Sequence, residues 1–178
     1  MARQIALLRG INLGPSRRVA MGELRELLNG LGYGDVRTLL QSGNVVLTSD
    51  LEPERLARAL EQQIAAGLGV SAAVVVRTRD ELADVVERNP LGAVATDPRR
   101  YQVSFLSGEP DPEAVREIEA VDVAPERFAV SGREIYAWHP DGIQRSPLVK
   151  LLSEQRLGVT ATARNWSTVT KLLALAGE

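Results

Sequence analysis

Apolar and polar positions follow two alternating patterns along residues 1–78. Four short apolar runs, bounded by glycine or polar residues, are too short for helices and predict buried strands. Between them, apolar residues at three- and four-residue spacing predict two amphipathic helices. In chain order the predicted elements are strand 4–9, helix 21–31, strand 36–41, strand 44–48, helix 56–68 and strand 71–77. A tight turn at Ser42-Gly43 joins the two middle strands, and the order is β-α-β-β-α-β.

The second half of the chain repeats this order, again with a Ser-Gly turn between its middle strands. Its predicted elements are strand 101–106, helix 113–120, strand 127–130, strand 134–138, helix 147–156 and strand 159–161. A last apolar stripe from Trp166 to Ala176, with Asn165 as N-cap, predicts a C-terminal helix. The predicted fold class is therefore α+β, with two tandem ferredoxin-like (β-α-β-β-α-β) subdomains plus a C-terminal helix.

These patterns divide the chain into three parts. Residues 1–78 form the first ferredoxin-like half, and residues 101–178 form the second half with the C-terminal helix. Residues 79–100 are interpreted as a helical linker, a helix of about 79–88 followed by a proline-containing loop. Strand 4–9 is apolar on both faces, so a second layer must cover it. Sheet-on-sheet packing, the C-terminal helix and a partner subunit in a homo-oligomer all remain open.

The amino-acid composition limits the kinds of partner and site that we expect. The chain has 178 residues, of which 44% are hydrophobic and 25% charged, so it can bury a core and fold as a soluble globular protein. Its net charge of -2 provides no general positive field, so we expect neither nucleic acid nor a membrane as partner. With no cysteine and one histidine, we predict no metal and no cofactor. No apolar run approaches membrane-spanning length and no signal peptide is evident, so we expect a cytoplasmic protein.

The strongest chemical signal is the segment Arg9-Gly-Ile-Asn-Leu-Gly-Pro-Ser-Arg-Arg18. It places two glycines between a strand end and a helix start, with three arginines nearby. Backbone N–H groups at a helix N-terminus and guanidinium groups both bind anions, although the spacing matches no nucleotide-binding motif. One interpretation is an anion cradle that uses Arg9, Asn12 and Arg17. The other is a structural loop whose arginines are solvated.

Two further segments allow the same two interpretations, a ligand-binding role or a structural role. Gln41 and Asn44 flank the first Ser-Gly turn, where their amides can bind a ligand or satisfy backbone groups. Arg164 lies between a predicted strand and the C-terminal helix, and Asn165 and Trp166 beside it fit a helix cap and a core anchor. The predicted ligand-binding residues are Arg9, Asn12, Arg17, Gln41, Asn44 and Arg164, whereas catalytic residues are left unknown.

Other reactive or aromatic side chains are interpreted as structural. His139 lacks a second metal ligand and no nucleophile elbow is present, so a catalytic role is disfavoured. Ser146 is predicted to cap the helix that Pro147 begins. Alternation places Tyr101 and Phe105 on one face of their strand, which favours core packing over stacking on nucleic-acid bases.

Three blocks of the sequence resemble the bacterial domain-of-unknown-function 1697 family across nearly the whole chain. The blocks are Leu8-Arg-Gly-Ile-Asn-Leu-Gly14, Leu40-Gln-Ser-Gly-Asn-Val-Val46 and Thr162-Ala-Arg-Asn-Trp166. The resemblance implies two ferredoxin-like subdomains and no established activity. Members of that family often continue the first block with a second glycine and a lysine, where this chain has Pro15 and Arg17. Pro15 removes one backbone N–H group from the cradle.

Three functional hypotheses follow. The first is a binding module for a small anionic ligand, phosphate-bearing or nucleotide-like, whose residues converge at strand ends. The second is an enzyme that acts on a phosphorylated or nucleotide-like substrate and uses arginines to stabilise charge. The third, suggested by the doubly apolar strands, is a protein-interaction or self-assembly module.

Overall fold

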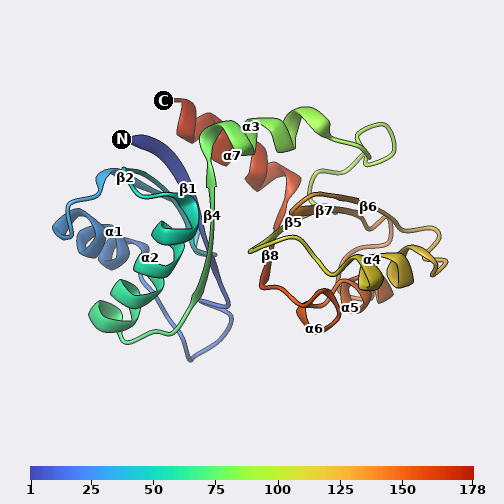
Figure 1. The fold of residues 1–178 in the computed structure, drawn as a ribbon, viewed down its shortest axis with the longest axis horizontal. Coiled ribbons are helices and arrows are strands. Elements are labelled where there is room, and N and C mark those ends of the chain that lie inside the picture. Colours follow the sequence, from blue (N-terminus) through green and yellow to red (C-terminus); the bar gives the residue numbers. More distant parts are fainter. The chain divides into compact units, whose positions relative to one another are not determined.

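The computed structural model describes residues 1–178. The chain forms two compact units (Figure 1). Unit 1 comprises Met1–Ala83 with Lys171–Glu178, and unit 2 comprises Asp84–Thr170. Each unit contains one four-stranded antiparallel sheet. The predicted α+β class is therefore confirmed.

The sheet of unit 1 has the strand order β2-β3-β1-β4, and each neighbouring pair is antiparallel. Its elements are β1 (Ala2–Arg9), α1 (Met21–Gly30), β2 (Gly34–Leu39), β3 (Asn44–Ser49), α2 (Pro53–Leu68) and β4 (Ala73–Thr78). Helices α1 and α2 cover one face of the sheet (Figure 1), with Leu24 and Leu56 buried against Leu8 and its neighbours. The central strand β1 is buried on both faces from Gln4 to Leu8, as predicted.

Every predicted strand of unit 1 is present, and the largest difference in bounds is at β2. This strand begins at Gly34, two residues earlier than predicted, and ends at Leu39. Its pairing with β3 shifts in register between Gly34 and Arg37, where Asp35 has a positive φ of 43°. An irregularity of this kind interrupts the alternation of apolar and polar side chains, so sequence periodicity does not mark the start of the strand.

The sheet of unit 2 has the order β6-β7-β5-β8 and is likewise antiparallel throughout. Its elements are β5 (Tyr101–Leu106), α4 (Pro112–Glu119), β6 (Arg127–Ser131), β7 (Glu134–Trp138), α5 (Pro147–Leu151), α6 (Glu154–Leu157) and β8 (Ala161–Asn165). The helices pack on the sheet through a cluster that includes Leu106, Ile118, Ile135, Leu148 and Leu157.

Two predictions for unit 2 are corrected. The single helix predicted over 147–156 is two short helices, because the backbone leaves the helical region at Leu152 and is extended at Ser153, the N-cap residue before α6. The strand predicted over 159–161 lies later, at Ala161–Asn165. Thr162 and Arg164 occupy its buried positions, so the strand lacks the apolar side chains by which a buried strand is recognised in a sequence.

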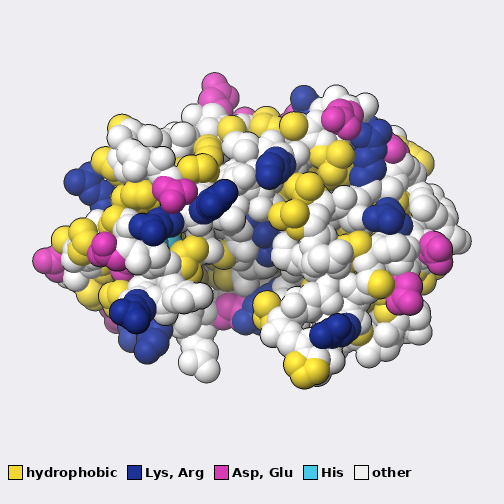
Figure 2. All heavy atoms as spheres, turned by 180° about the vertical axis from the view of Figure 1, so that it is seen from behind, with side chains coloured by type: hydrophobic (Ala, Val, Ile, Leu, Met, Phe, Trp, Pro, Cys, Tyr) yellow, Lys and Arg dark blue, Asp and Glu magenta, His cyan; other side chains and the backbone are white.

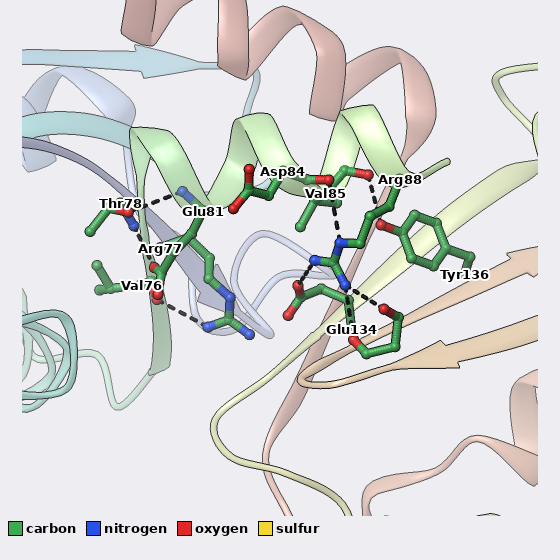
Figure 3. A network of polar contacts seen from close by, with 10 residues as sticks. Val76, Arg77, Thr78, Glu81, Asp84, Val85, Arg88, Glu134 and Tyr136 are labelled. Atoms are coloured by element: carbon green, nitrogen blue, oxygen red, sulfur yellow. Dashed lines mark hydrogen bonds and ion pairs between the residues drawn. The ribbon is translucent and has the colours of Figure 1, made fainter. Parts of the chain in front are cut away.

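Helices α3 (Arg79–Arg88) and α7 (Trp166–Gly177) each contribute residues to both units. A reciprocal pair of hydrogen bonds between Thr78 and Glu81 begins α3 (Figure 3), each side chain accepting from the other residue's backbone N–H at 2.8 and 3.1 Å. The Thr168 N–H donates to Asn165 Oδ1 at 2.9 Å, which confirms the predicted N-cap of α7. No helix of the chain combines the length and the apolar character needed to cross a membrane.

Three aromatic side chains pack together in unit 2. The rings of Tyr101 and Trp166 stack with centroids 4.9 Å apart, and Tyr136 lies beside them. The Tyr136 hydroxyl donates to the Val85 carbonyl at 2.7 Å (Figure 3), and the Tyr101 hydroxyl donates to Asn89 at 2.9 Å. Both tyrosines are buried, so the predicted core role of Tyr101 is confirmed.

Alkaline pH is expected to weaken the fold through these tyrosines. Burial raises the pKa of Tyr101 and of Tyr136 to about 12 from an ordinary value of 10. Because the folded-state pKa exceeds the unfolded value, this stabilisation is complete below pH 10 and is lost as pH rises towards 12. Denaturant titrations across this interval should show a falling free energy of unfolding, with a shallower fall in Tyr136→Phe. Equal slopes in the wild type and this variant would contradict the assignment.

Candidate functional site

The loop between β1 and α1, residues 10–20, is held in place by Asn12. Its backbone has a positive φ of 56°, which asparagine tolerates better than most residues. Its side-chain amide donates to the carbonyls of Val19 at 2.9 Å and Gln41 at 2.6 Å, and its oxygen accepts from Val19 N at 2.9 Å. The Asn12 N–H donates to the Arg17 carbonyl at 3.0 Å. Asn12 therefore ties the loop to itself and to the β2–β3 turn.

A hollow of about 410 Å³ opens on this loop, and we call it the Arg17 hollow. Its lining is Arg9, Gly10, Leu13, Gly14, Ser16 and Arg17. Arg17 has a positive φ of 59° and is exposed, and its guanidinium has no hydrogen-bond or ion-pair partner in the chain. Its Nη1 lies 3.3 Å from the point where residue 10 would carry a Cβ, so Gly10 gives the guanidinium room. Two arginines line the hollow and no acidic side chain does.

The β2–β3 turn lies beside the loop at the same end of the unit 1 sheet. Leu8 N donates to the Gly43 carbonyl at 2.8 Å, which joins the turn to β1. Asn44 is fully buried, and its amide donates to the Leu39 carbonyl at 2.8 Å and to Ser42 Oγ at 2.9 Å. Gln41 is exposed at the edge of the turn. Five of the six predicted site residues thus gather at this end of the sheet: Arg9, Asn12, Arg17, Gln41 and Asn44.

The sixth predicted residue, Arg164, belongs to unit 2. It lies within β8 and not in a loop before α7, so the predicted position at a helix start is corrected. Its side chain is 8% exposed, and Nη1 donates to Thr162 Oγ1 at 2.7 Å and to the Ala163 carbonyl at 2.9 Å. Burial lowers its pKa to about 10. Convergence of Arg164 with the other five residues stays a prediction.

A buried polar cluster in unit 2 was not predicted as a group. His139 Nδ1 lies 2.6 Å from Glu126 Oε2 and 2.9 Å from Ser146 Oγ, and the Ser146 hydroxyl also donates to Glu126. Glu126 and Ser146 therefore approach the same ring nitrogen, whereas a hydrolytic triad needs them on opposite nitrogens. Ser146 also accepts from Val149 N at 3.3 Å, which confirms the predicted helix cap. No spacing pattern connects residue 126 with residues 139 and 146, so sequence periodicity carried no signal for this cluster.

Elsewhere the surface carries charge of both signs. Figure 2 shows basic and acidic side chains distributed over one face of the chain, which agrees with a net charge of -2. The two arginines of the Arg17 hollow are therefore a local concentration of positive charge and not part of a general positive field. No cluster of three or more histidine, aspartate or glutamate side chains gathers in a way that could hold a metal ion.

Comparison with known proteins adds a family and a fold. Residues 1–136 match the family model described as "Protein of unknown function (DUF1697)". This range includes the loop of the Arg17 hollow and the β2–β3 turn. A solved structure, the conserved bacterial protein SP0830 from Streptococcus pneumoniae, is 23% identical, with a TM-score of 0.78 and coverage of 98% of both chains. At that identity the likeness shows the fold alone. No curated protein matches the chain.

Proposed function

The chain belongs to the DUF1697 family of proteins of unknown function, and we propose that its first unit binds a small anionic ligand, phosphate-bearing or nucleotide-like. The observation that carries this proposal is the Arg17 hollow. It combines two arginines, no acidic side chain and a loop already held in one conformation. Its volume of about 410 Å³ falls within the roughly 300–1,000 Å³ that is usual for small-molecule sites.

The proposal gives different roles to the predicted residues. Arg9 and Arg17 contact the anion, because both line the hollow and guanidinium groups bind phosphate oxygens in pairs. Asn12, Gln41 and Asn44 position the loop and the turn through the hydrogen bonds described above. Fixing the loop before the ligand arrives reduces the entropy lost on binding.

The lining also favours binding over catalysis. Ser16 is the one hydroxyl-bearing side chain in the hollow, and no histidine, aspartate or glutamate lines it. General acid–base catalysis needs a group of that kind within hydrogen-bond reach of the reacting proton. Charge recognition is therefore the chemistry that these residues supply.

Binding is tested by isothermal titration with inorganic phosphate and with ADP. Arg17→Gln is expected to raise the Kd about tenfold, because it removes a charge-assisted pair of hydrogen bonds. Arg58→Gln is the matched control, since Arg58 is an exposed arginine on α2 outside the hollow and the change in net charge is the same. No binding of either probe, or equal Kd values in the two variants, would refute the proposed site.

The same membership supports the finer description of the fold. We infer that residues 1–78 and 101–178 are two ferredoxin-like subdomains joined by a helical linker at 79–100, with the C-terminal helix beginning in the second and its residues from Lys171 onward grouped with unit 1. The matching strand orders of the two sheets support this description, as does the helix Arg79–Arg88 at the start of the linker.

A further inference from the structure

Unit 2 contains an arginine-lined hollow of its own, formed by two loops that lie far apart in the sequence. This Arg145 hollow has a volume of about 470 Å³, and its lining includes Arg99, Arg100, Asp141, Gly142 and Arg145. We propose that it is a second anion site, distinct from the Arg17 hollow, for a small ligand that carries a diphosphate group. This inference does not depend on the proposed function of unit 1.

The positive charges around the hollow are only partly compensated within the chain. Three arginines and one acidic residue, Asp141, line it. Arg100 bonds to the Pro140 carbonyl and lies 3.7 Å from an oxygen of Asp97. The side chains of Arg99 and Arg145, in contrast, are exposed and have no hydrogen-bond or ion-pair partner in the chain. Gathering like charges around one hollow is unfavourable without a counter-charge, which an anionic ligand supplies.

The two loops are held together before any ligand binds. His139 N donates to the Arg100 carbonyl at 3.0 Å, which fixes the strand end at Arg100 against the loop that follows β7. That loop turns at Gly142, whose φ is 94° and whose N–H donates to the His139 carbonyl at 3.0 Å. These backbone hydrogen bonds connect the two segments that carry the arginines.

The buried polar cluster explains why this loop is closed. His139 precedes the loop and Ser146 follows it, and their side chains meet at 2.9 Å with Glu126 bonded to both. Residues 140–145 thus begin and end at the same buried point. A loop fixed at both ends loses little conformational entropy on binding, which raises its affinity for a ligand that fits.

The chemistry favours a diphosphate-bearing small molecule. Two guanidinium groups without internal partners match two adjacent phosphate groups better than one, since each can take a forked pair of phosphate oxygens. The volume of about 470 Å³ suits a small molecule.

Site-resolved NMR tests this inference on the full chain, with inorganic pyrophosphate as the probe. The amide resonance of Gly142 should shift in a saturable way, and Arg99→Gln and Arg145→Gln should each weaken that Kd about tenfold. Arg156→Gln, an exposed arginine on α6, is the control and should leave the Kd unchanged. The amide of Gly14 reports the Arg17 hollow in the same spectra, so failure at one site is distinguishable from failure at the other.

Three results would overturn the inference. If the Gly142 amide does not shift, pyrophosphate does not bind at the hollow. If Arg156→Gln raises the Kd as much as the other two variants, the binding is general charge attraction and not a specific site. Inorganic phosphate or citrate binding as tightly as pyrophosphate would exclude the diphosphate class. Preference for pyrophosphate over both, lost in the two arginine variants alone, is the supporting result.

Discussion

Gly43→Ala is expected to lower the free energy of unfolding of unit 1 by about 2–5 kcal/mol. Two physical causes add together. Gly43 has a φ of +88°, a conformation that is strained for any residue with a Cβ. The new Cβ would also lie 2.7 Å from Leu8 Cβ and 2.9 Å from Ile11 Cδ1, both of which are buried core residues. Because Leu8 Cβ is attached directly to β1, the clash cannot be relieved by a side-chain rotation.

The second half of the chain offers a matched control for Gly43. Gly132 occupies the corresponding Ser-Gly turn between β6 and β7, with a φ of +59° and no atom within 4 Å of an added Cβ. Gly132→Ala therefore tests the backbone conformation alone and should cost about 1–2 kcal/mol. Denaturant titrations followed by far-ultraviolet circular dichroism measure both losses. If the two variants lose equal stability, the close approach of the turn to Leu8 is not what requires glycine at residue 43.

This pair of glycines also shows what can be predicted from the sequence. The two Ser-Gly turns were predicted because strand periodicity breaks at both points and glycine permits a tight turn. The difference between them was not predicted, since it arises from a contact between Gly43 and β1 that no local pattern records. Strands were predicted correctly where their buried positions carry apolar side chains. Strand β8 was misplaced because Thr162 and Arg164 fill its buried positions.

The candidate sites likewise separate into features that neighbouring residues reveal and features that depend on tertiary contacts. The loop of the Arg17 hollow was found because its glycines and arginines are adjacent in sequence. The role of Asn12 in closing that loop was not, since its partner at Gln41 lies in another turn. The Arg145 hollow was not predicted from the sequence, because Arg99 and Arg145 come together only when β5 and β7 pair and the loops at their ends meet. Tertiary pairing, and not residue type, creates that site.

Glu126→Ala is expected to destabilise unit 2 by about 2–4 kcal/mol, because buried polar groups left without a partner cost about 1–3 kcal/mol each. Glu126 is 8% exposed, bonds to Ser146 and His139, and accepts from Leu148 N at 3.3 Å. Alanine supplies none of these bonds and leaves a space that is too enclosed for easy rehydration. Tryptophan fluorescence measures the loss, since Trp138 and Trp166 both belong to unit 2.

Ser146→Ala is the informative comparison for Glu126→Ala. It removes the cap of α5, but Glu126 remains to bond with His139 and Leu148, so its cost should be about 1 kcal/mol. The double variant should lose less than the sum of the two, because both residues belong to one hydrogen-bonded cluster. Additive losses would show that the serine and the carboxylate act independently. In that case the loop 140–145 would not owe its closed form to their contact, and the preorganisation argued for the Arg145 hollow would fail with it.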